Sequence, residues 1–246
     1  MQQSIRSPLL LQYYLGRLAV FIVGPMVIGA VWLAGYRIRG LKRFRRQVGQ
    51  IMGRHAGPWL ICANHLTLID SFILAYAMFP LHRYMLRYHL VPWNVPEYMN
   101  FNRNVLVGLL CYLLKCVPVK RGGDRADVRL TLEKCMFLLS QGANLMIFPE
   151  GTRSRHGRVN TRDFTYNVGQ MYQKTPGCRV LCIYLRGDGQ DTYSSIPRSG
   201  ETFSVQAAEI KPGTRCKGLR AYRDCATQII NKLSEMEEAY FAGRWK

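Results

Sequence analysis

The chain has 246 residues, which is enough for one large domain with a substantial core. Its 34 Lys and Arg against 15 Asp and Glu give a net charge of +19, which indicates an anionic partner: nucleic acid, a phospholipid surface or a phosphorylated substrate. The eight cysteines include no Cys-x-x-Cys pair, which excludes the common zinc spacings, so we expect no metal site and buried free thiols typical of a reducing compartment.

The amino-terminal segment is the most apolar part of the chain. Residues 18–36 form 19 consecutive positions without a charge. As a helix they would measure about 28 Å, close to the hydrocarbon thickness of a bilayer. Gly24 and Pro25 interrupt the segment, so residues 1–36 are expected to anchor the protein either as one span or as a kinked re-entrant pair. A buried core helix is the alternative, but few soluble helices lack polar residues on every face.

A basic cluster follows this segment. Six of the ten residues from 37 to 46 are Lys or Arg. Their position beside the apolar segment favours anionic membrane lipids over nucleic acid as the partner. Only Arg6 and Arg17 precede the segment, so the charge bias predicts a membrane protein with its main domain on the cytoplasmic side. Nothing in the sequence specifies the oligomeric state.

Residues 37–246 alternate between strand-like and helix-like patterns. Short apolar runs predict strands at 59–63, 116–119, 145–148, 179–185 and 202–205. Apolar residues at helical spacing predict helices over 71–79, over 128–139 and around 222–236, whereas residues 92–103 have no clear periodicity. The run from 116 to 148 reads as a βαβ unit. We therefore predict one α/β domain with a mixed, partly parallel sheet flanked by helices.

A histidine and an aspartate five residues apart follow the first of these strands, in an Asn-His-x-x-x-x-Asp pattern ending at Asp70. On a continuous helix His65 and Asp70 would lie about 140° apart. Thr67-x-x-Asp70, however, has the form of a capping box, which predicts Thr67 as the N-cap and Asp70 leaning back toward His65 in the loop.

Two interpretations of this pair remain open. In one, Asp70 only caps the helix and His65 is an ordinary loop histidine. In the other, Asp70 fixes the imidazole tautomer and leaves the second ring nitrogen as a general base. No Gly-x-Ser-x-Gly pattern supplies a serine nucleophile, and Cys62 lies inside an apolar strand. The base would then act on the hydroxyl of a substrate.

The second motif is Phe-Pro-Glu-Gly-Thr-Arg-Ser at residues 148–154. Gly151 allows the backbone to bend or approach a ligand closely, and Arg153 offers a planar set of donors suited to phosphate. Glu150 can accept a hydrogen bond from a hydroxyl or pair with an arginine. Arg121 follows the strand at 116–119, so the βαβ unit places it at the same sheet edge as Glu150. The alternative is a tight turn with a surface Glu–Arg pair.

Both motifs, complete and in this order, resemble those of the glycerolipid acyltransferase family, which includes the 1-acylglycerol-3-phosphate acyltransferases. The resemblance covers roughly residues 36–185. It implies an α/β fold and transfer of a fatty acyl group from acyl-CoA or acyl-carrier protein to a lysophospholipid-type hydroxyl, without a bound cofactor or metal. It implies His65 as the base, Asp70 as its partner, and Arg121, Glu150, Gly151, Thr152 and Arg153 as acceptor-binding residues.

The chain departs from the family pattern in two motifs and in a longer stretch between His65 and Arg121. The strand at 180–185 lacks the usual proline, and no Phe-Lys-x-Gly run follows the second motif. These departures leave the catalytic centre intact but leave the acceptor open, so an amino-lipid, a glycolipid or a specialised metabolite is an alternative. A non-catalytic basic membrane-surface protein is a further alternative, against which the intact motifs argue.

Overall fold

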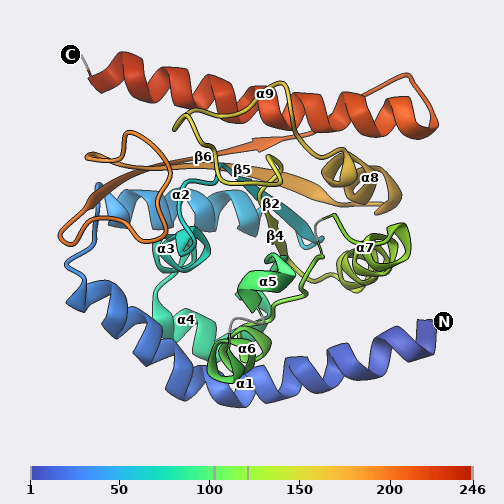
Figure 1. Cartoon of the computed structure of the whole chain (residues 1–246), viewed down its shortest axis with the longest axis horizontal. Helices are drawn as coiled ribbons and strands as arrows, with labels where there is room; N and C mark the ends of the chain where they lie inside the picture. The colour runs from blue at the N-terminus through green and yellow to red at the C-terminus, as the bar shows by residue number, and fades with distance from the viewer. Residues whose placement is uncertain (1, 102–103, 121, 245–246) are drawn as a thin grey trace.

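A six-stranded sheet lies between two layers of helices (Figure 1) in the computed structural model, which describes residues 2–101, 104–120 and 122–244. The strand order is β1-β6-β5-β2-β4-β3, with β5 and β6 antiparallel and the other neighbours parallel. This arrangement confirms the predicted mixed α/β fold. The strands are β1 (Arg37–Ile38), β2 (Trp59–Ala63), β3 (Trp93–Asn94), β4 (Leu145–Ile147), β5 (Arg179–Gly187) and β6 (Thr202–Ile210).

The helices begin and end close to the predicted positions where the sequence pattern was clear. Those of the amino-terminal half are α1 (Gln2–Leu33), α2 (Leu41–Gly53), α3 (Asp70–Met78), α4 (Leu81–Leu86), α5 (Tyr98–Phe101) and α6 (Val105–Leu113), with a 3-10 turn at Tyr88–Leu90. Those of the carboxyl-terminal half are α7 (Arg125–Ser140), α8 (Asn167–Lys174) and α9 (Gly218–Arg244).

The central strands bury both of their faces. Leu60 and Cys62 of β2 pack with side chains of α7, α8 and α9, whereas Trp59, Ile61 and Ala63 pack with those of α2 and α3. Residues of β5 alternate in the same way. Because successive side chains point to opposite faces, a strand covered on both sides is a continuous apolar run. This double cover explains why β2 and β5 could be recognised from the sequence.

The strand predicted at 116–119 is not a regular strand. This segment makes two isolated bridges, from Cys116 to Asn94 and from Val119 to Glu97. Strand β3 lies between it and β4, so the predicted βαβ unit does not join neighbouring strands. Pro118 supplies the physical reason, since its missing N–H interrupts any ladder of hydrogen bonds. The intervening strand comes from residues 92–103, where the sequence showed no pattern.

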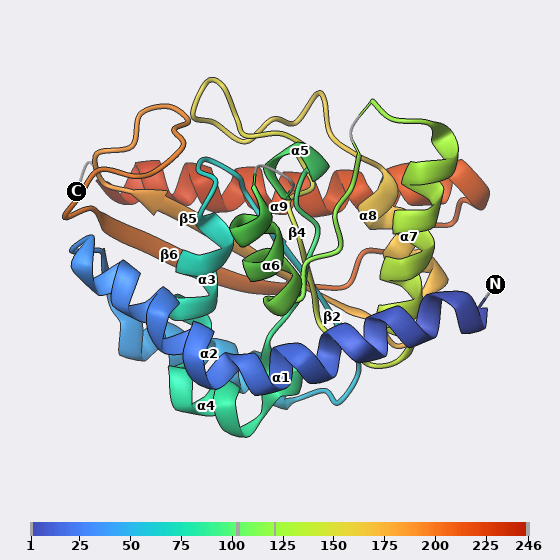
Figure 2. The same cartoon turned by 60° about the horizontal axis from the view of Figure 1, so that its bottom comes forward.

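Helix α1 continues through Pro25, where a break or kink was expected. It packs along α3, α4 and α6, and Figure 2 shows it lying across one side of the molecule. Because Pro25 lies on the exposed side and the neighbouring turns are held against the domain, the missing hydrogen bond does not end the helix. Within the described residues, 5–33 are the one helical stretch long and apolar enough to cross a membrane.

All eight cysteines are free thiols, as predicted. Cys111 is half-buried and Cys216 is exposed, while the other six are buried. Burial raises the pKa of the Cys62 thiol well above its usual range, because a thiolate there would lose its hydration. This agrees with the expectation that Cys62, although close in sequence to the histidine motif, is not a nucleophile.

Candidate active site

The histidine and aspartate of the first motif meet in the turn between β2 and α3. His65 Nδ1 lies 3.0 Å from Asp70 Oδ2. The same carboxylate oxygen accepts hydrogen bonds from the backbone N–H groups of Leu66 (2.7 Å) and Thr67 (2.8 Å), and Oδ1 accepts one from the Thr67 hydroxyl. Four donors therefore face Asp70, an environment suited to an ionised carboxylate, which only accepts hydrogen bonds.

The start of α3 differs from the predicted capping box. The helix begins at Asp70 with Ile69 in the N-cap position, so Thr67 is not the N-cap. The Thr67 hydroxyl donates to Asp70 instead of accepting a helix N–H group, because the carboxylate is the stronger acceptor. Asp70 nevertheless leans back across the loop to His65, as the sequence predicted.

The imidazole of His65 is held by a ring contact as well as by Asp70. Its plane stacks on Phe148 with 4.1 Å between ring centroids and 19° between planes. Since an acceptor-only carboxylate faces Nδ1, this nitrogen carries the proton in the neutral ring. Nε2 has no hydrogen-bond partner among the described residues, and the side chain is 13% exposed. The ring therefore presents a free basic nitrogen from a fixed position.

Glu150 connects the two motifs. It is 5% exposed; its Oε1 accepts the backbone N–H of His65 and its Oε2 that of Asn160, both at 3.0 Å. A third link runs the other way, from the Ser154 N–H to the His65 carbonyl at 2.9 Å. The family resemblance implied that Glu150 binds the acceptor, which stays a prediction. In the structure both of its carboxylate oxygens are engaged with backbone, so it holds the two loops together.

Burial raises the pKa of Glu150 from its ordinary 4.5 to about 7, although the two backbone hydrogen bonds partly oppose the shift. The folded state therefore binds this proton more tightly than the unfolded state. The stabilisation is fully present below about pH 4.5 and is lost as the pH rises through about 7.

We expect the free energy of unfolding of the wild type, relative to Glu150→Gln, to fall by about 1–3 kcal/mol between pH 4.5 and 7.5 and then to level off. Denaturant unfolding of both proteins in detergent across this range measures the difference. Parallel pH profiles would contradict the assignment of the raised pKa to Glu150.

The remaining predicted residues lie in the same loop, with one exception. Gly151 has φ +70°, in the left-handed region that favours glycine, and Thr152 is exposed. Arg153 donates from Nη1 to the Ser194 carbonyl at 3.0 Å. Arg121 lies outside the described residues. Among the described residues no three His, Cys, Asp or Glu side chains lie close enough to hold a metal ion.

A loop after β5, residues 191–197, completes the site and was not found from the sequence. Its Ser194 N–H donates to the Leu66 carbonyl at 3.0 Å, and the Leu68 N–H donates to the Ser195 carbonyl at 3.2 Å. The guanidinium of Arg153 lies 5.3 Å from the centre of the Tyr193 ring. These contacts are almost all to backbone atoms, which leave no residue signature in the sequence. The loop joins the histidine turn to the arginine.

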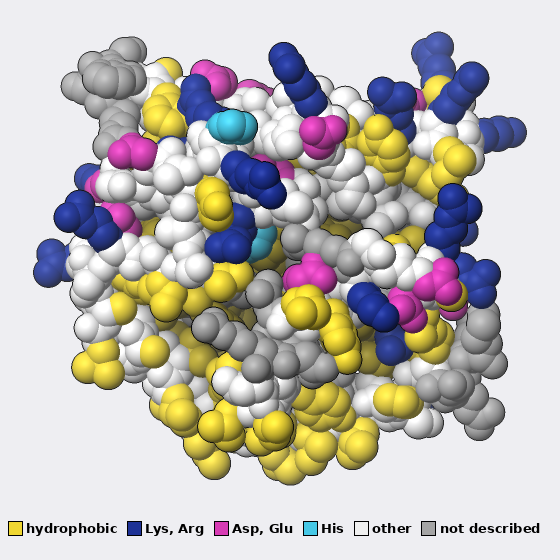
Figure 3. Space-filling model, in the orientation of Figure 1, with side chains coloured by type: hydrophobic (Ala, Val, Ile, Leu, Met, Phe, Trp, Pro, Cys, Tyr) yellow, Lys and Arg dark blue, Asp and Glu magenta, His cyan; other side chains and the backbone are white. Residues whose placement is uncertain are grey.

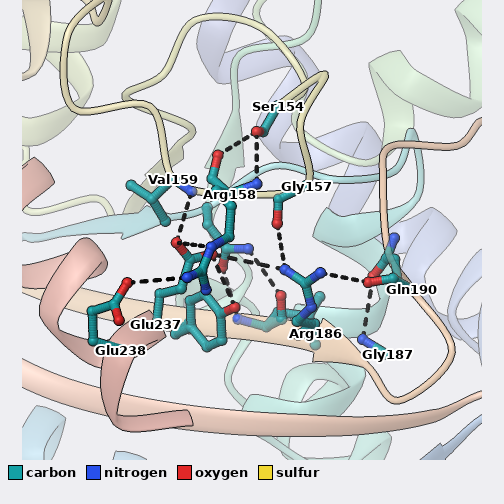
Figure 4. A network of polar contacts seen from close by, with 12 residues as sticks. Ser154, Gly157, Arg158, Val159, Arg186, Gly187, Gln190, Glu237 and Glu238 are labelled. Carbon is teal, nitrogen blue, oxygen red and sulfur yellow. Dashed lines mark hydrogen bonds and ion pairs between the residues drawn. The ribbon is translucent and has the colours of Figure 1, made fainter. Parts of the chain in front are cut away.

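The far end of the arginine loop is held from α9 (Figure 4). The buried carboxylate of Glu237 accepts the Val159 N–H at 3.0 Å and the Tyr184 hydroxyl at 3.2 Å. It also lies 3.7 Å from the guanidinium of Arg186, which in turn donates to the carbonyl of Gly157. Glu237 could have been singled out from the sequence, because it lies four positions after Leu233 and so is an acidic residue on the apolar stripe of this helix.

Replacing Glu237 by glutamine should lower the free energy of unfolding by about 3 kcal/mol, because a buried arginine and a backbone N–H lose a charged partner. The neighbouring Glu238 is a matched control: its side chain is 66% exposed and pairs only with Arg158 among the described residues. Glu238→Gln should cost less than about 1 kcal/mol. Denaturant unfolding of the two variants compares them, and equal losses would show that the Glu237 network does not hold the loop.

Comparisons with known proteins agree with this geometry. Residues 36–186, which are more than half of the chain, match the family model described as Acyltransferase. Over 85 residues the chain is 38% identical to a chloroplastic 1-acyl-sn-glycerol-3-phosphate acyltransferase of Arabidopsis thaliana and 36% identical to one of Brassica napus. Each alignment covers 35% of this chain and only 23% or 24% of the relative, so the chain spans about a quarter of the length of these relatives.

The family model that matches residues 36–186 therefore identifies the class of protein as an acyltransferase. The chain belongs to the glycerolipid acyltransferase family, as the two motifs indicated.

Proposed function

We propose that the protein is a membrane-associated O-acyltransferase that moves a fatty acyl group from acyl-CoA or acyl-carrier protein to the hydroxyl of a lysophospholipid-type acceptor. The observation that carries the proposal is the His65–Asp70 pair at 3.0 Å, whose free ring nitrogen faces no other partner among the described residues. Family membership and the names of the two plant relatives support a 1-acylglycerol-3-phosphate-like acceptor.

In the proposed reaction, His65 Nε2 takes the proton from the acceptor hydroxyl as its oxygen attacks the carbonyl carbon of the thioester. The carbon–sulfur bond then breaks, and the leaving thiolate receives a proton from the imidazolium. Asp70, 3.0 Å from Nδ1, stabilises the positive charge that His65 carries between the two transfers. General-base catalysis of this kind contributes about 10²–10⁴-fold to the rate.

Arg153 is the proposed binding group for the acceptor phosphate, because its planar guanidinium matches the oxygens of a phosphate. One of its nitrogens is already held by the Ser194 carbonyl, which fixes the direction of the remaining donors. Gly151 and Thr152 supply a bent backbone and an exposed hydroxyl beside it. Arg121 remains a candidate for a second contact with the anionic group.

Membrane association is proposed from α1 and the charge that follows it. Residues 5–33 are long and apolar enough to insert in a bilayer, and the basic cluster at 37–46 suits anionic headgroups. The basic cluster that follows the helix supports a domain on the cytoplasmic side, whose leaflet carries anionic lipids.

The test is an acyl-transfer assay with the full-length protein in anionic vesicles, in which radiolabelled acyl-CoA or acyl-carrier protein is offered with 1-acylglycerol-3-phosphate. We expect a diacyl phospholipid product with at least one donor. The departures from the family pattern at 180–185 make a non-glycerolipid acceptor the second candidate. Lipid and metabolite profiling of cells with and without the protein distinguishes the two, and an acyl product that contains no glycerol would overturn the lysophospholipid assignment.

A further inference from the structure

One face of α1 is attached to the domain along nearly the whole helix. From Ile5 to Val23 its buried residues recur every three or four positions, which is the spacing of one helical face, and Val31 is buried again near the end of the helix. Residues near its start pack in the core beneath α7 to α9, and residues near its end pack in the core beneath α2 and α3. The buried residues are Ile5, Leu9, Gln12, Gly16, Val20, Val23 and Val31. Apolar lipid contact does not account for a glutamine in this set.

Gln12 is a polar attachment point in the middle of this face. It is 5% exposed, and its Nε2 donates to the carbonyls of Tyr112 and Cys116, both at 2.9 Å. These carbonyls lie at and just beyond the carboxyl end of α6, where a helix leaves acceptors unsatisfied. One turn further on, a Cβ at Gly16 would lie 2.6 Å from the Leu113 carbonyl, so only glycine permits this approach. Separating α1 from the domain would leave the Gln12 amide without these two acceptors.

A buried lysine supports the same contact. Lys115 is fully buried, and its Nζ donates to the carbonyls of Tyr88 and Val91 at 3.1 and 2.9 Å. Its Nζ lies 4.8 Å from the ring centre of Tyr13 on α1 and 4.2 Å from that of Tyr88. The Tyr13 ring therefore closes one side of an aromatic cage around this amine, whose pKa burial lowers to about 7. Moving α1 away would open this cage.

These attachments are incompatible with α1 crossing a bilayer. The helix has 32 residues and measures about 48 Å, whereas about 20 residues cross the hydrocarbon. Since its inner face contacts the domain from Ile5 to Val31, any 20-residue stretch that crossed would carry parts of α3, α4 and α6 into the hydrocarbon with it. The exposed, charged Arg87 directly follows α4 and would enter the hydrocarbon with it.

The outer face of α1 is nevertheless apolar and exposed. Figure 3 shows hydrophobic side chains gathered on the side of the molecule where α1 and α6 lie, whereas the Lys and Arg side chains visible in this view lie mostly away from that side. A soluble monomer rarely exposes a continuous apolar surface of this extent. The exposed residues are Leu10, Leu11, Tyr14, Leu15, Leu18, Phe21, Ile22, Met26, Trp32 and Leu33 of α1, Leu86 of α4, and Val105, Leu106 and Leu109 of α6.

We propose that α1 lies in the plane of one leaflet of an anionic bilayer, with its outer face in the hydrocarbon and its inner face on the domain. The amino terminus and the domain are then on the same side of the membrane. Exposed Arg6 and Arg17 on α1, and the basic cluster at 37–46 directly after it, supply the charge complementarity to anionic headgroups. The inference rests on the membrane association proposed above and not on acyl transfer.

The first test asks whether the amino terminus lies on the same side of the membrane as the domain. The full-length protein carries one epitope tag at each end. In one arm it is added from outside to sealed vesicles of phosphatidylglycerol and phosphatidylcholine. In the other arm it is expressed in cells, whose membranes are then sealed into vesicles of known orientation. We expect protease added to one side to remove both tags, and protease on the other side to remove neither. Tags on opposite sides would show a spanning helix and overturn the proposal.

Charge substitutions on the outer face are the second test. Leu18→Glu/Ile22→Glu alters two exposed positions one turn apart, 72% and 70% exposed, and should weaken vesicle binding by about tenfold or more per residue. Leu219→Glu is the matched control: Leu219 is 81% exposed on α9, across the sheet from α1, and binding should be unchanged.

Circular dichroism and size-exclusion chromatography in detergent accompany these binding measurements. Wild-type binding by a folded Leu18→Glu/Ile22→Glu variant would overturn the proposal. The proposal would also be overturned if the wild type were a dimer and the variant a monomer that still binds vesicles. The outer face of α1 would then be an interface between two copies of the chain. Neither test measures acyl transfer, so its result does not depend on whether the proposed activity is correct.

Discussion

Replacing His65 by alanine is expected to lower the rate of acyl transfer by at least about 10²–10⁴-fold. The imidazole is the group whose free Nε2 can take the acceptor proton, and it is held in place by Asp70 and by stacking on Phe148. The measurement is transfer of a radiolabelled acyl group to 1-acylglycerol-3-phosphate by the full-length protein in anionic vesicles. Sedimentation with the vesicles should be unchanged, since the residues proposed to face the membrane lie on α1, α4 and α6.

His89→Ala is the control for loss of a histidine at a distance from the site. His89 is exposed in the 3-10 turn after α4, and its imidazole makes no hydrogen bond to the described part of the chain. Its substitution should leave the rate within about twofold, because surface changes away from specific contacts have small effects. Full activity of a folded His65→Ala protein would rule out His65 as the general base.

Asp70→Asn is expected to cost about 10²–10⁴ in rate with the fold retained. An asparagine oxygen in the position of Oδ2 can still accept hydrogen bonds from the His65 ring and from two backbone N–H groups. The amide nitrogen can then donate to the Thr67 hydroxyl, which is also a hydrogen-bond acceptor. What the substitution removes is the negative charge that stabilises the imidazolium. The loss should therefore appear mainly in kcat, with little change in the thermal midpoint.

Thr67→Val is the matched control for the geometry of the Asp70 turn. It removes one hydrogen-bond donor to Asp70 and keeps both the carboxylate charge and the Thr67 backbone N–H contact. We expect a loss of about 1 kcal/mol in stability and a much smaller change in rate than for Asp70→Asn. If the two variants lose activity equally, Asp70 acts by shaping the turn and not through its charge.

Local patterns in the sequence were sufficient for much of the fold and for the centre of the site. Strands β2 and β5 are buried on both faces, so they were continuous apolar runs. The return of Asp70 to His65 was predictable because five residues around one helix start leave few arrangements of the chain. The N-cap was misplaced by two residues, at Thr67 instead of Ile69, because the sequence does not tell which acceptor the Thr67 hydroxyl finds.

Other features depend on contacts between distant segments. The 92–103 region gave no periodic signal, yet it supplies β3, because two residues paired with β4 are too few to form a pattern. Loop 191–197 reaches Arg153 and the His65 turn through backbone carbonyls and N–H groups, which every residue carries. Glu237 acts from the last helix, about 80 residues after the loop it holds.

The sequence alone was sufficient to predict the chemistry proposed for this protein, because the histidine, the aspartate and the Glu-Gly-Thr-Arg loop belong to short motifs whose residues are close along the chain. The tertiary structure decided what these residues touch. Glu150 became a link between two backbones, and α1 became a helix fixed to the domain at Gln12. Both outcomes have the same physical reason. Periodicity reports whether a side chain is buried, but only the packed chain determines which distant donors and acceptors meet it.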